Sequence, residues 1–91
     1  MPLAYVPILD LEYDPKTVIA FENLEAFPTD VNTADRRQLL RTPGIGPKAA
    51  ERILRNRRNF KIDNWRDLQA FGVVRKRAWP FITFPGHKPQ A

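Results

Sequence analysis

Residues 42–48 form the segment Thr-Pro-Gly-Ile-Gly-Pro-Lys, whose glycines and lysine are suited to bind an anion. Gly44 can adopt the positive φ that a tight turn between two antiparallel helices needs. Gly46 leaves bare backbone where the next helix starts, and there the first amide groups have no partner within the helix. The helix dipole and Lys48 add positive charge at the same place. The segment therefore predicts a phosphate site that positions a nucleic acid without reading its bases.

A simpler interpretation is that the two glycines only make an efficient helix–helix turn. The charges downstream favour phosphate binding over this alternative. Arg52 and Arg55 lie in the helix that follows the turn, and a second turn at Gly72 leads to Arg75 and Lys76. Two turns that each precede a basic segment can follow two stretches of nucleic-acid backbone. We expect a side chain introduced at Gly46 to block the phosphate and also to strain the turn.

The net charge of +5 conceals an asymmetry along the chain. Residues 1–30 carry six acidic side chains against one lysine, whereas residues 31–91 carry fourteen Lys or Arg against four acidic side chains. Such an excess of positive charge in one part of a chain indicates a polyanionic partner for that part.

The composition also limits the classes of function. A chain of 91 residues forms one small domain and leaves little room for a deep substrate pocket. It contains no cysteine, which excludes disulfides, thiolate zinc sites and iron–sulfur clusters held by this chain. No apolar run approaches the roughly 20 residues that span a bilayer, and the first residues lack the pattern of a signal peptide. We therefore expect a cytoplasmic protein that makes no membrane contact.

The pattern of apolar and turn residues predicts an all-α fold, a small helical domain preceded by an extended segment and a short helix. We predict helices over residues 15–26, 32–41, 47–58 and 64–72, then a short helix that ends near residue 80 and an extended strap over residues 81–84. The predicted organisation is an acidic N-terminal segment over 1–30, a helical domain over 31–84 and a flexible tail over 85–91, which includes His87.

Individual residues are predicted to start, stop and bury these helices. Gly72 is expected to end the fourth helix as a C-terminal glycine. The expected N-caps are Asp14 for the first helix, Asn32 or Thr33 for the second, and Asp63 or Asn64 for the fourth. Val18 and Phe21, with Leu24 or Glu25, are expected along one edge of the first helix. The residues expected to face inward in the later elements are Ala34, Leu39, Leu40, Ile45, Ala49, Ala50, Ile53 and Leu54. Aromatic side chains can stack on bases, but core packing is the favoured interpretation for Phe60, Trp65, Phe71, Trp79 and Phe81.

The segment Val31-Asn32-Thr33-Ala34, then Leu39-Leu40, Pro43-Gly44-Ile45-Gly46, Ala49-Ala50 and Ile53, resembles the helix-hairpin-helix family. It is most similar to the branch found in competence-type DNA receptors. Residues 63–80 resemble a second, degenerate hairpin of a tandem helix-hairpin-helix domain. The resemblance implies sequence-independent binding of duplex DNA through the hairpin, and a turn that can hold a monovalent cation on its backbone carbonyls. With the basic segments added, the candidate DNA-binding residues are Gly44, Ile45, Gly46, Lys48, Arg52, Arg55, Arg75 and Lys76.

A narrower resemblance involves Asp14-Pro15-Lys16, Phe27-Pro28, Gly72-Val73-Val74 and Pro80-Phe81-Ile82-Thr83. These segments are similar to the C-terminal region of DNA modification or repair proteins of the radical SAM class. That resemblance implies either a C-terminal fragment of such a protein, in which residues 1–30 would contact a catalytic domain or partner, or a stand-alone relative. The cysteines that such catalysis needs are absent from this chain.

These patterns predict a DNA-binding accessory domain of a repair, modification or uptake system. We expect no enzymatic activity from this chain on its own, no required cofactor and no metal site, because no nucleophile lies in a pattern with a base and an orienting group. The alternative class is a protein–protein interaction scaffold, in which the acidic residues 1–30 contact a basic partner. Salt dependence separates the two, because phosphate binding weakens steeply with salt.

Overall fold

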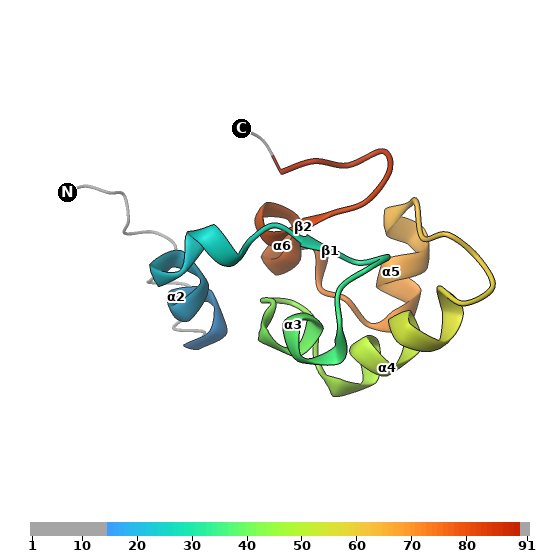
Figure 1. Ribbon diagram of the computed structural model, residues 1–91, viewed down its shortest axis with the longest axis horizontal. Helices are drawn as coiled ribbons and strands as arrows, with labels where there is room; N and C mark the ends of the chain where they lie inside the picture. The colour runs from blue at the N-terminus through green and yellow to red at the C-terminus, as the bar shows by residue number, and fades with distance from the viewer. Residues whose placement is uncertain (1–14, 90–91) are drawn as a thin grey trace.

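The computed structural model describes residues 15–89 of the chain. Helices make up most of it, with two short 3-10 turns and two short strands (Figure 1). In chain order the elements are α2 (Pro15–Glu22), η2 (Leu24–Ala26), β1 (Thr29–Asp30), α3 (Arg36–Arg41), α4 (Pro47–Asn56), α5 (Trp65–Phe71), α6 (Arg75–Ala78), η3 (Trp79–Phe81) and β2 (Ile82–Thr83).

The prediction of a purely helical fold was wrong in one respect, because β1 and β2 form a parallel pair. Thr29 lies opposite Ile82 and Asp30 opposite Thr83, and the amide of Val31 continues the pairing by donating to the carbonyl of Thr83 at 3.3 Å. Strands of two residues leave no periodic pattern in a sequence, so only the extended course of residues 81–84 could be predicted. The pair joins the segment before α3 to the end of the domain.

The core lies between α3, α4 and α5, where the predicted apolar faces meet. Leu39, Ala50 and Ile53 are fully buried, as predicted, and Ala49 is almost so. Ala34, Leu40 and Leu54 are half-buried and pack against this cluster. Ile82, in β2 near the end of the chain, packs into the same core. The amphipathic pattern of α4 therefore identified the correct face.

The first helix is shorter than predicted and buries different residues. It ends at Glu22, and a separate 3-10 turn, η2, follows it. Thr17 and Ala20 are its buried residues, while Phe21 is 43% exposed even though its ring meets Phe81 edge-on. The helix presents small residues to the rest of the molecule, so the large apolar side chains of its sequence were a misleading guide. The predicted N-cap, Asp14, lies outside the described residues.

The predicted N-cap of the second helix was also wrong. Asp35 caps α3, and its carboxylate accepts from the amide of Gln38 at 2.8 Å. Asn32 is used elsewhere, because its side-chain amide donates to the carbonyl of Ile62 and accepts from the amide of the same residue, both at 2.8 Å. A paired contact with a distant strand-like segment prevents Asn32 from acting as a local cap. Thr33, the alternative, precedes the helix without capping it.

The remaining helix ends agree with the sequence more closely. α4 begins at Pro47, as predicted, and ends two residues early at Asn56. Asn64 caps α5 through a bond from the amide of Asp67, and Gly72 ends the helix with φ of 109°. α6 is a single turn, and η3 continues it as far as Phe81.

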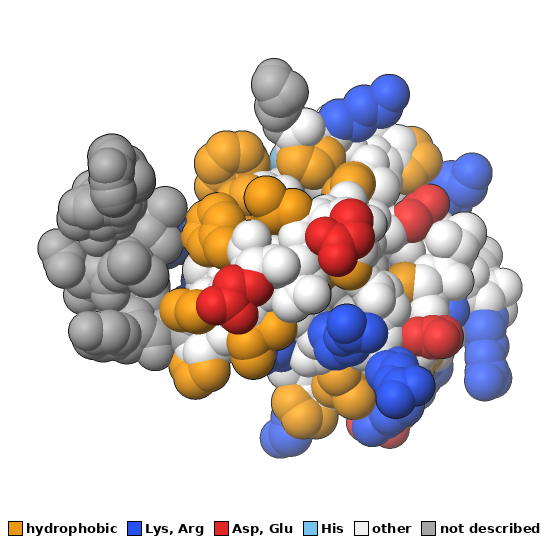
Figure 2. Space-filling view, turned by 60° about the vertical axis from the view of Figure 1, so that its left-hand side comes forward, with side chains coloured by type: hydrophobic (Ala, Val, Ile, Leu, Met, Phe, Trp, Pro, Cys, Tyr) orange, Lys and Arg blue, Asp and Glu red, His pale blue; other side chains and the backbone are white. Residues whose placement is uncertain are grey.

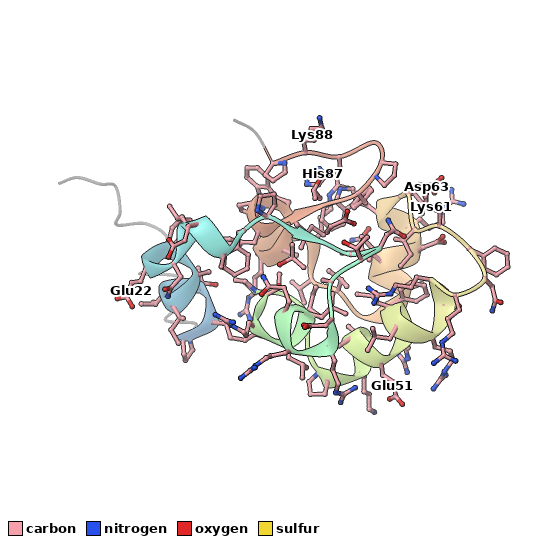
Figure 3. The ribbon with its side chains drawn as sticks, in the orientation of Figure 1. Glu22, Glu51, Lys61, Asp63, His87 and Lys88 are labelled. Carbon is pink, nitrogen blue, oxygen red and sulfur yellow. The ribbon has the colours of Figure 1, made fainter. Side chains whose placement is uncertain are left out.

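The last described residues, assigned by the sequence to a flexible tail, fold back on the domain. Phe84 and His87 form an antiparallel bridge. The Nε2 of His87 hydrogen-bonds to the carbonyl oxygen of Trp79 at 3.0 Å, and its ring lies 5.1 Å from that of Trp65. These contacts hold the chain over α5 and η3. Figure 3 shows His87 and Lys88 above the helical layer, on the segment that returns across it.

Candidate nucleic-acid interface

The turn between α3 and α4 has the backbone geometry that its sequence predicts. Thr42 ends α3, and its carbonyl accepts from the amide of Ile45 at 3.2 Å. Gly44 has φ of 85°, a value that side chains disfavour. Ile45 is 1% exposed and inserts into the core between the two helices, which confirms its prediction as the apolar anchor of the turn. This turn, residues 42–47, is called the first hairpin turn below.

Gly44 is required for packing as well as for its φ. A Cβ at this position would lie 2.8 Å from both the Cβ of Ala78 and the carbonyl oxygen of Val74. The carbonyl of Gly44 also accepts from the amide of Val74 at 2.9 Å. The first hairpin turn is therefore fixed directly against the start of α6.

Gly46 has a different role, because neither φ nor packing requires a glycine there. Its φ is −96° and its ψ −176°, extended values open to any residue, and a Cβ would meet no heavy atom within 4 Å. The expectation that a side chain would strain the turn at Gly46 was therefore wrong. What the glycine leaves is open space in front of the first turn of α4, where an incoming group can approach the backbone.

The N-terminus of α4 lacks the side-chain cap that α3 and α5 have. Asp35 caps α3 and Asn64 caps α5, whereas Gly46 at the start of α4 offers no side chain. The carbonyl of Gly46 accepts from Ala50, so the amides before Ala50 have no acceptor within the helix. The helices that enter the hairpins are thus capped, and the helix that leaves the first one is open toward the empty space at Gly46.

The second turn, at Gly72, repeats this arrangement in part. Gly72 has φ of 109°, and Val73 after it is 4% exposed, which matches the buried Ile45. A Cβ on Gly72 would lie 3.7 Å from that of Ala49, so each turn packs against the helix that leaves the other turn. Val74 takes the place of Gly46 as the uncapped first residue, and its side chain is 46% exposed. The second hairpin is therefore present, with an exposed valine at the position where the first turn has a glycine.

Basic side chains of α4 extend from the open end of the helix along its exposed face. Lys48 and Arg52 are one turn apart, and both are exposed. The guanidinium of Arg52 donates to the carbonyl of Phe71 at 3.2 Å, which places it between the two hairpins. Arg55, one turn further on, lies 3.6 Å from the carboxylate of Glu51. Lys48 is therefore the nearest full positive charge of α4 to the open amides, and Arg55 lies about 10 Å further along the helix.

Three further basic residues differ in their contacts. The guanidinium of Arg75 lies 5.1 Å from the ring centroid of Trp65 and is held there by a cation–π contact. Lys76 is exposed beside it. Arg57 donates to the carbonyl of Val31 at 3.0 Å and thus stabilises the fold. Figure 2 shows Lys and Arg gathered mostly below and to the right of the centre of that face, with hydrophobic side chains mostly to the left.

Lys16 is a residue of the hairpin surroundings that the sequence did not indicate. Its ammonium donates to the carbonyl of Ile45 at 2.6 Å from α2, 29 residues away. Three other carbonyls of the turn also accept hydrogen bonds from amides, that of Thr42 from Ile45, that of Gly44 from Val74, and that of Gly46 from Ala50. A monovalent cation on the carbonyl of Ile45 would therefore compete with the ammonium of Lys16.

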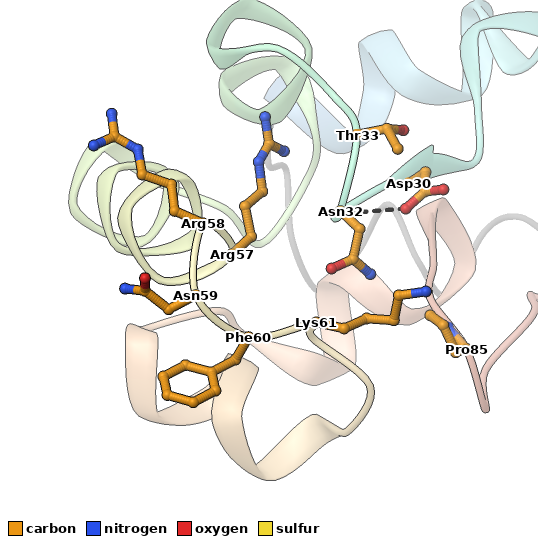
Figure 4. Close-up of a pocket in the computed structure, with 9 residues that line it drawn as sticks. All are labelled: Asp30, Asn32, Thr33, Arg57, Arg58, Asn59, Phe60, Lys61 and Pro85. Atoms are coloured by element: carbon orange, nitrogen blue, oxygen red, sulfur yellow. Dashed lines mark hydrogen bonds between the residues drawn. The ribbon is translucent and has the colours of Figure 1, made fainter.

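A separate hollow of about 390 Å³ lies at the opposite end of α4 (Figure 4). Its polar groups hold the fold together, since Asp30 accepts from the amide of Asn32 at 2.9 Å and Arg57 binds the chain at Val31. Phe60 stands at its rim and is 70% exposed, so its prediction as a core residue was wrong. This hollow is no part of the hairpin surface.

Two further observations bear on other classes of function. Within residues 15–89, no group of three or more His, Cys, Asp or Glu side chains is placed to hold a metal ion. No helix in the same residues has the length and apolar character needed to cross a bilayer.

The fold and the turn define a class of small helical domains in which two hairpins pack against each other and expose the N-terminus of a helix. A family model described as helix-hairpin-helix motif matches residues 28–78, more than half of the chain. The protein belongs to the helix-hairpin-helix family, whose motif is generally associated with DNA binding that does not depend on sequence. No curated protein and no solved structure gave a significant match.

Proposed function

We propose that this protein binds duplex DNA through the first hairpin turn and makes its contacts with backbone phosphates rather than with bases. It acts as an accessory domain of a DNA repair, modification or uptake system and has no catalytic activity of its own. The observation that carries this proposal is the open N-terminus of α4, where uncapped amides face the free space at Gly46 with Lys48 beside them. Helix N-termini of this kind bind phosphate oxygens.

Two sets of charges support the grip on the DNA. Lys48 and Arg52 extend the contact along α4, with Arg55 behind them. Lys76 adds a charge at the second turn, while Arg75 is partly committed to Trp65. Because phosphate contacts carry no base information, we expect similar affinities for unrelated sequences.

No cofactor is needed in this proposal. The ammonium of Lys16 already pairs with the carbonyl of Ile45 and so supplies positive charge at the inner side of the turn. The only cation of the acidic residues 1–30 is thus placed at the hairpin. Residues of α2 consequently belong to the DNA-binding unit and do more than link it to a partner.

The experiment is a fluorescence anisotropy titration with two unrelated duplexes at about 50 and 200 mM salt. We expect equal affinities for both duplexes and a loss of at least about tenfold between the two salt concentrations. Lys48→Glu should abolish most of the binding. Lys61→Glu is the matched control, because it makes the same charge change beyond the opposite end of α4 (Figure 3). Equal losses in both variants would show that only net charge matters and would contradict a site at the hairpin.

A protein-interaction scaffold is the second candidate, and one feature favours it as an additional role. Ile19 and Leu24 are each 55% exposed on the N-terminal elements, which also carry the acidic residues Glu22 and Glu25. DNA binding that is weak at low salt and does not change at higher salt would favour this scaffold function over the DNA-binding proposal.

A further inference from the structure

The second hairpin exposes apolar side chains where the first exposes bare backbone. Val74 is 46% exposed and Trp79 is 47% exposed, although burial of such side chains would add to the stability of a small domain. Both line an open groove of about 650 Å³, together with Val73, Gln69, Arg75 and Lys76. The prediction that Trp79 belongs to the core was therefore wrong, and its exposure is unexplained by the fold.

The groove is contiguous with the first hairpin turn. Val74 donates its amide to the carbonyl of Gly44, and Ala78, next to Trp79, lies against Gly44. A nucleic-acid backbone held at the N-terminus of α4 therefore passes close to the groove. Within residues 15–89, Trp79 is the only exposed tryptophan.

Contacts hold the backbone around Trp79 in one conformation, so its exposed ring is positioned for a planar group to stack on it. The carbonyl of Trp79 is held by His87 at 3.0 Å, and the next residues, Pro80 and the buried Phe81, anchor the η3 turn. Aromatic side chains on a fixed backbone lose little conformational entropy when a ring stacks on them. The groove therefore combines the aromatic side chain of Trp79 with the ammonium of Lys76, since both residues line it.

We propose that this groove binds an unpaired nucleobase, which stacks on Trp79 and Val74 while Lys76 pairs with the adjoining phosphate. A flat apolar surface beside a cationic side chain and the amide of Gln69 matches the chemistry of a base on its backbone. The protein then prefers junctions between duplex and single-stranded DNA over continuous duplex. This inference rests on the proposed function, because the first hairpin turn holds the duplex part.

The test compares a blunt duplex with the same duplex carrying a short single-stranded overhang, by anisotropy at low salt. Wild-type protein should bind the overhang probe about fivefold or more tightly, the factor expected when one base stacks on an aromatic side chain. Trp79→Ala should abolish this preference and leave affinity for the blunt duplex unchanged. Trp79→Phe should retain most of the preference, which guards against a folding defect in the alanine variant.

Phe60→Ala is the matched control, since Phe60 is an exposed aromatic residue beside Arg58 and Lys61 but lies beyond the far end of α4. It should leave both affinities unchanged. A second readout uses Trp65→Phe protein, in which Trp79 is the only tryptophan. Its emission should be quenched by the overhang probe and much less by the blunt duplex.

The outcomes separate the two proposals. Equal wild-type affinities for both probes, or a preference that survives Trp79→Ala, would overturn the base-binding groove while the duplex-binding function stands, and a protein partner would then be the occupant to seek. Tight binding to the overhang probe that Trp79→Ala abolishes, with none to the blunt duplex, would support the groove and contradict the duplex grip.

Discussion

Replacing Gly46 by valine should separate DNA binding from folding. The structure places no atom within 4 Å of the added Cβ, and the φ of −96° suits a β-branched residue. Valine already occupies the corresponding position, Val74, at the start of α6. The substitution therefore adds its methyl groups to the space in front of the open amides of α4.

The expected changes have different sizes. Exchange of glycine for an apolar residue at an N-cap costs about 0.5–1 kcal/mol, which lowers the melting temperature of a domain of this size by about 2–8 °C. Loss of hydrogen bonds to a charged phosphate costs about 1.5–3 kcal/mol, so that DNA affinity should fall by about 10- to 100-fold. Circular dichroism melting and anisotropy with a blunt duplex measure the two effects.

Gly44→Ala provides the contrast within the same turn. Its φ of 85° and the 2.8 Å approaches to Ala78 and Val74 predict strain and overpacking. Together these cost about 2–4 kcal/mol, which lowers the melting temperature by at least about 8 °C. This variant should lose DNA binding through unfolding. A folded Gly46→Val protein with wild-type affinity would refute the reasoning, because the first hairpin turn would then not hold the phosphate.

Three more predictions follow from the contacts. Asp35→Ala should cost about 1 kcal/mol by removing the cap of α3, seen as a lower melting temperature, with DNA affinity unchanged; a loss of affinity would place α3 in the interface. In anisotropy titrations, the DNA affinity of the wild type should be the same in sodium and potassium salts, whereas that of Lys16→Met should depend on potassium. A wild-type affinity that depends on potassium would contradict the pairing of Lys16 with Ile45. The double variant Arg52→Ala with Arg55→Ala should flatten the salt slope of binding by roughly two, on every sequence tested alike; an effect confined to one sequence would indicate base reading.

The hairpin itself could be predicted from the sequence because its determinants are local. The positive φ at Gly44, the burial of Ile45 and the start of α4 at Pro47 each depend on neighbours within a few residues. The end of α5 at Gly72 follows the same logic. Local backbone preferences and an amphipathic pattern suffice to fix such features.

Features that depend on distant partners could not be predicted in this way. Asn32 has the right type for an N-cap, but its contact with Ile62 engages it, and Asp35 becomes the cap. The bond from Lys16 to Ile45 and the pairing of Thr29 with Ile82 likewise join segments far apart in the chain. The residues next to them in the sequence give no sign of these long-range contacts.

The exposure of aromatic residues was the least predictable property of the candidate site. Trp79 and Phe81 are two residues apart and of the same class, yet Phe81 is 2% exposed and Trp79 is 47% exposed. The η3 turn directs one ring inward and leaves the other in the groove. A single 3-10 turn is too short to leave a periodic pattern, so the sequence alone predicts both as core.

The most direct test of the central claim is an amide NMR titration of the full chain with a short duplex of arbitrary sequence. The account predicts the largest shift changes at Gly46, Lys48 and Ala49, with smaller changes at the start of α6. The same residues should respond to a second, unrelated duplex. Changes centred instead on the connection around Phe60, or confined to α2, would contradict the account, because DNA would then be held away from the open end of α4.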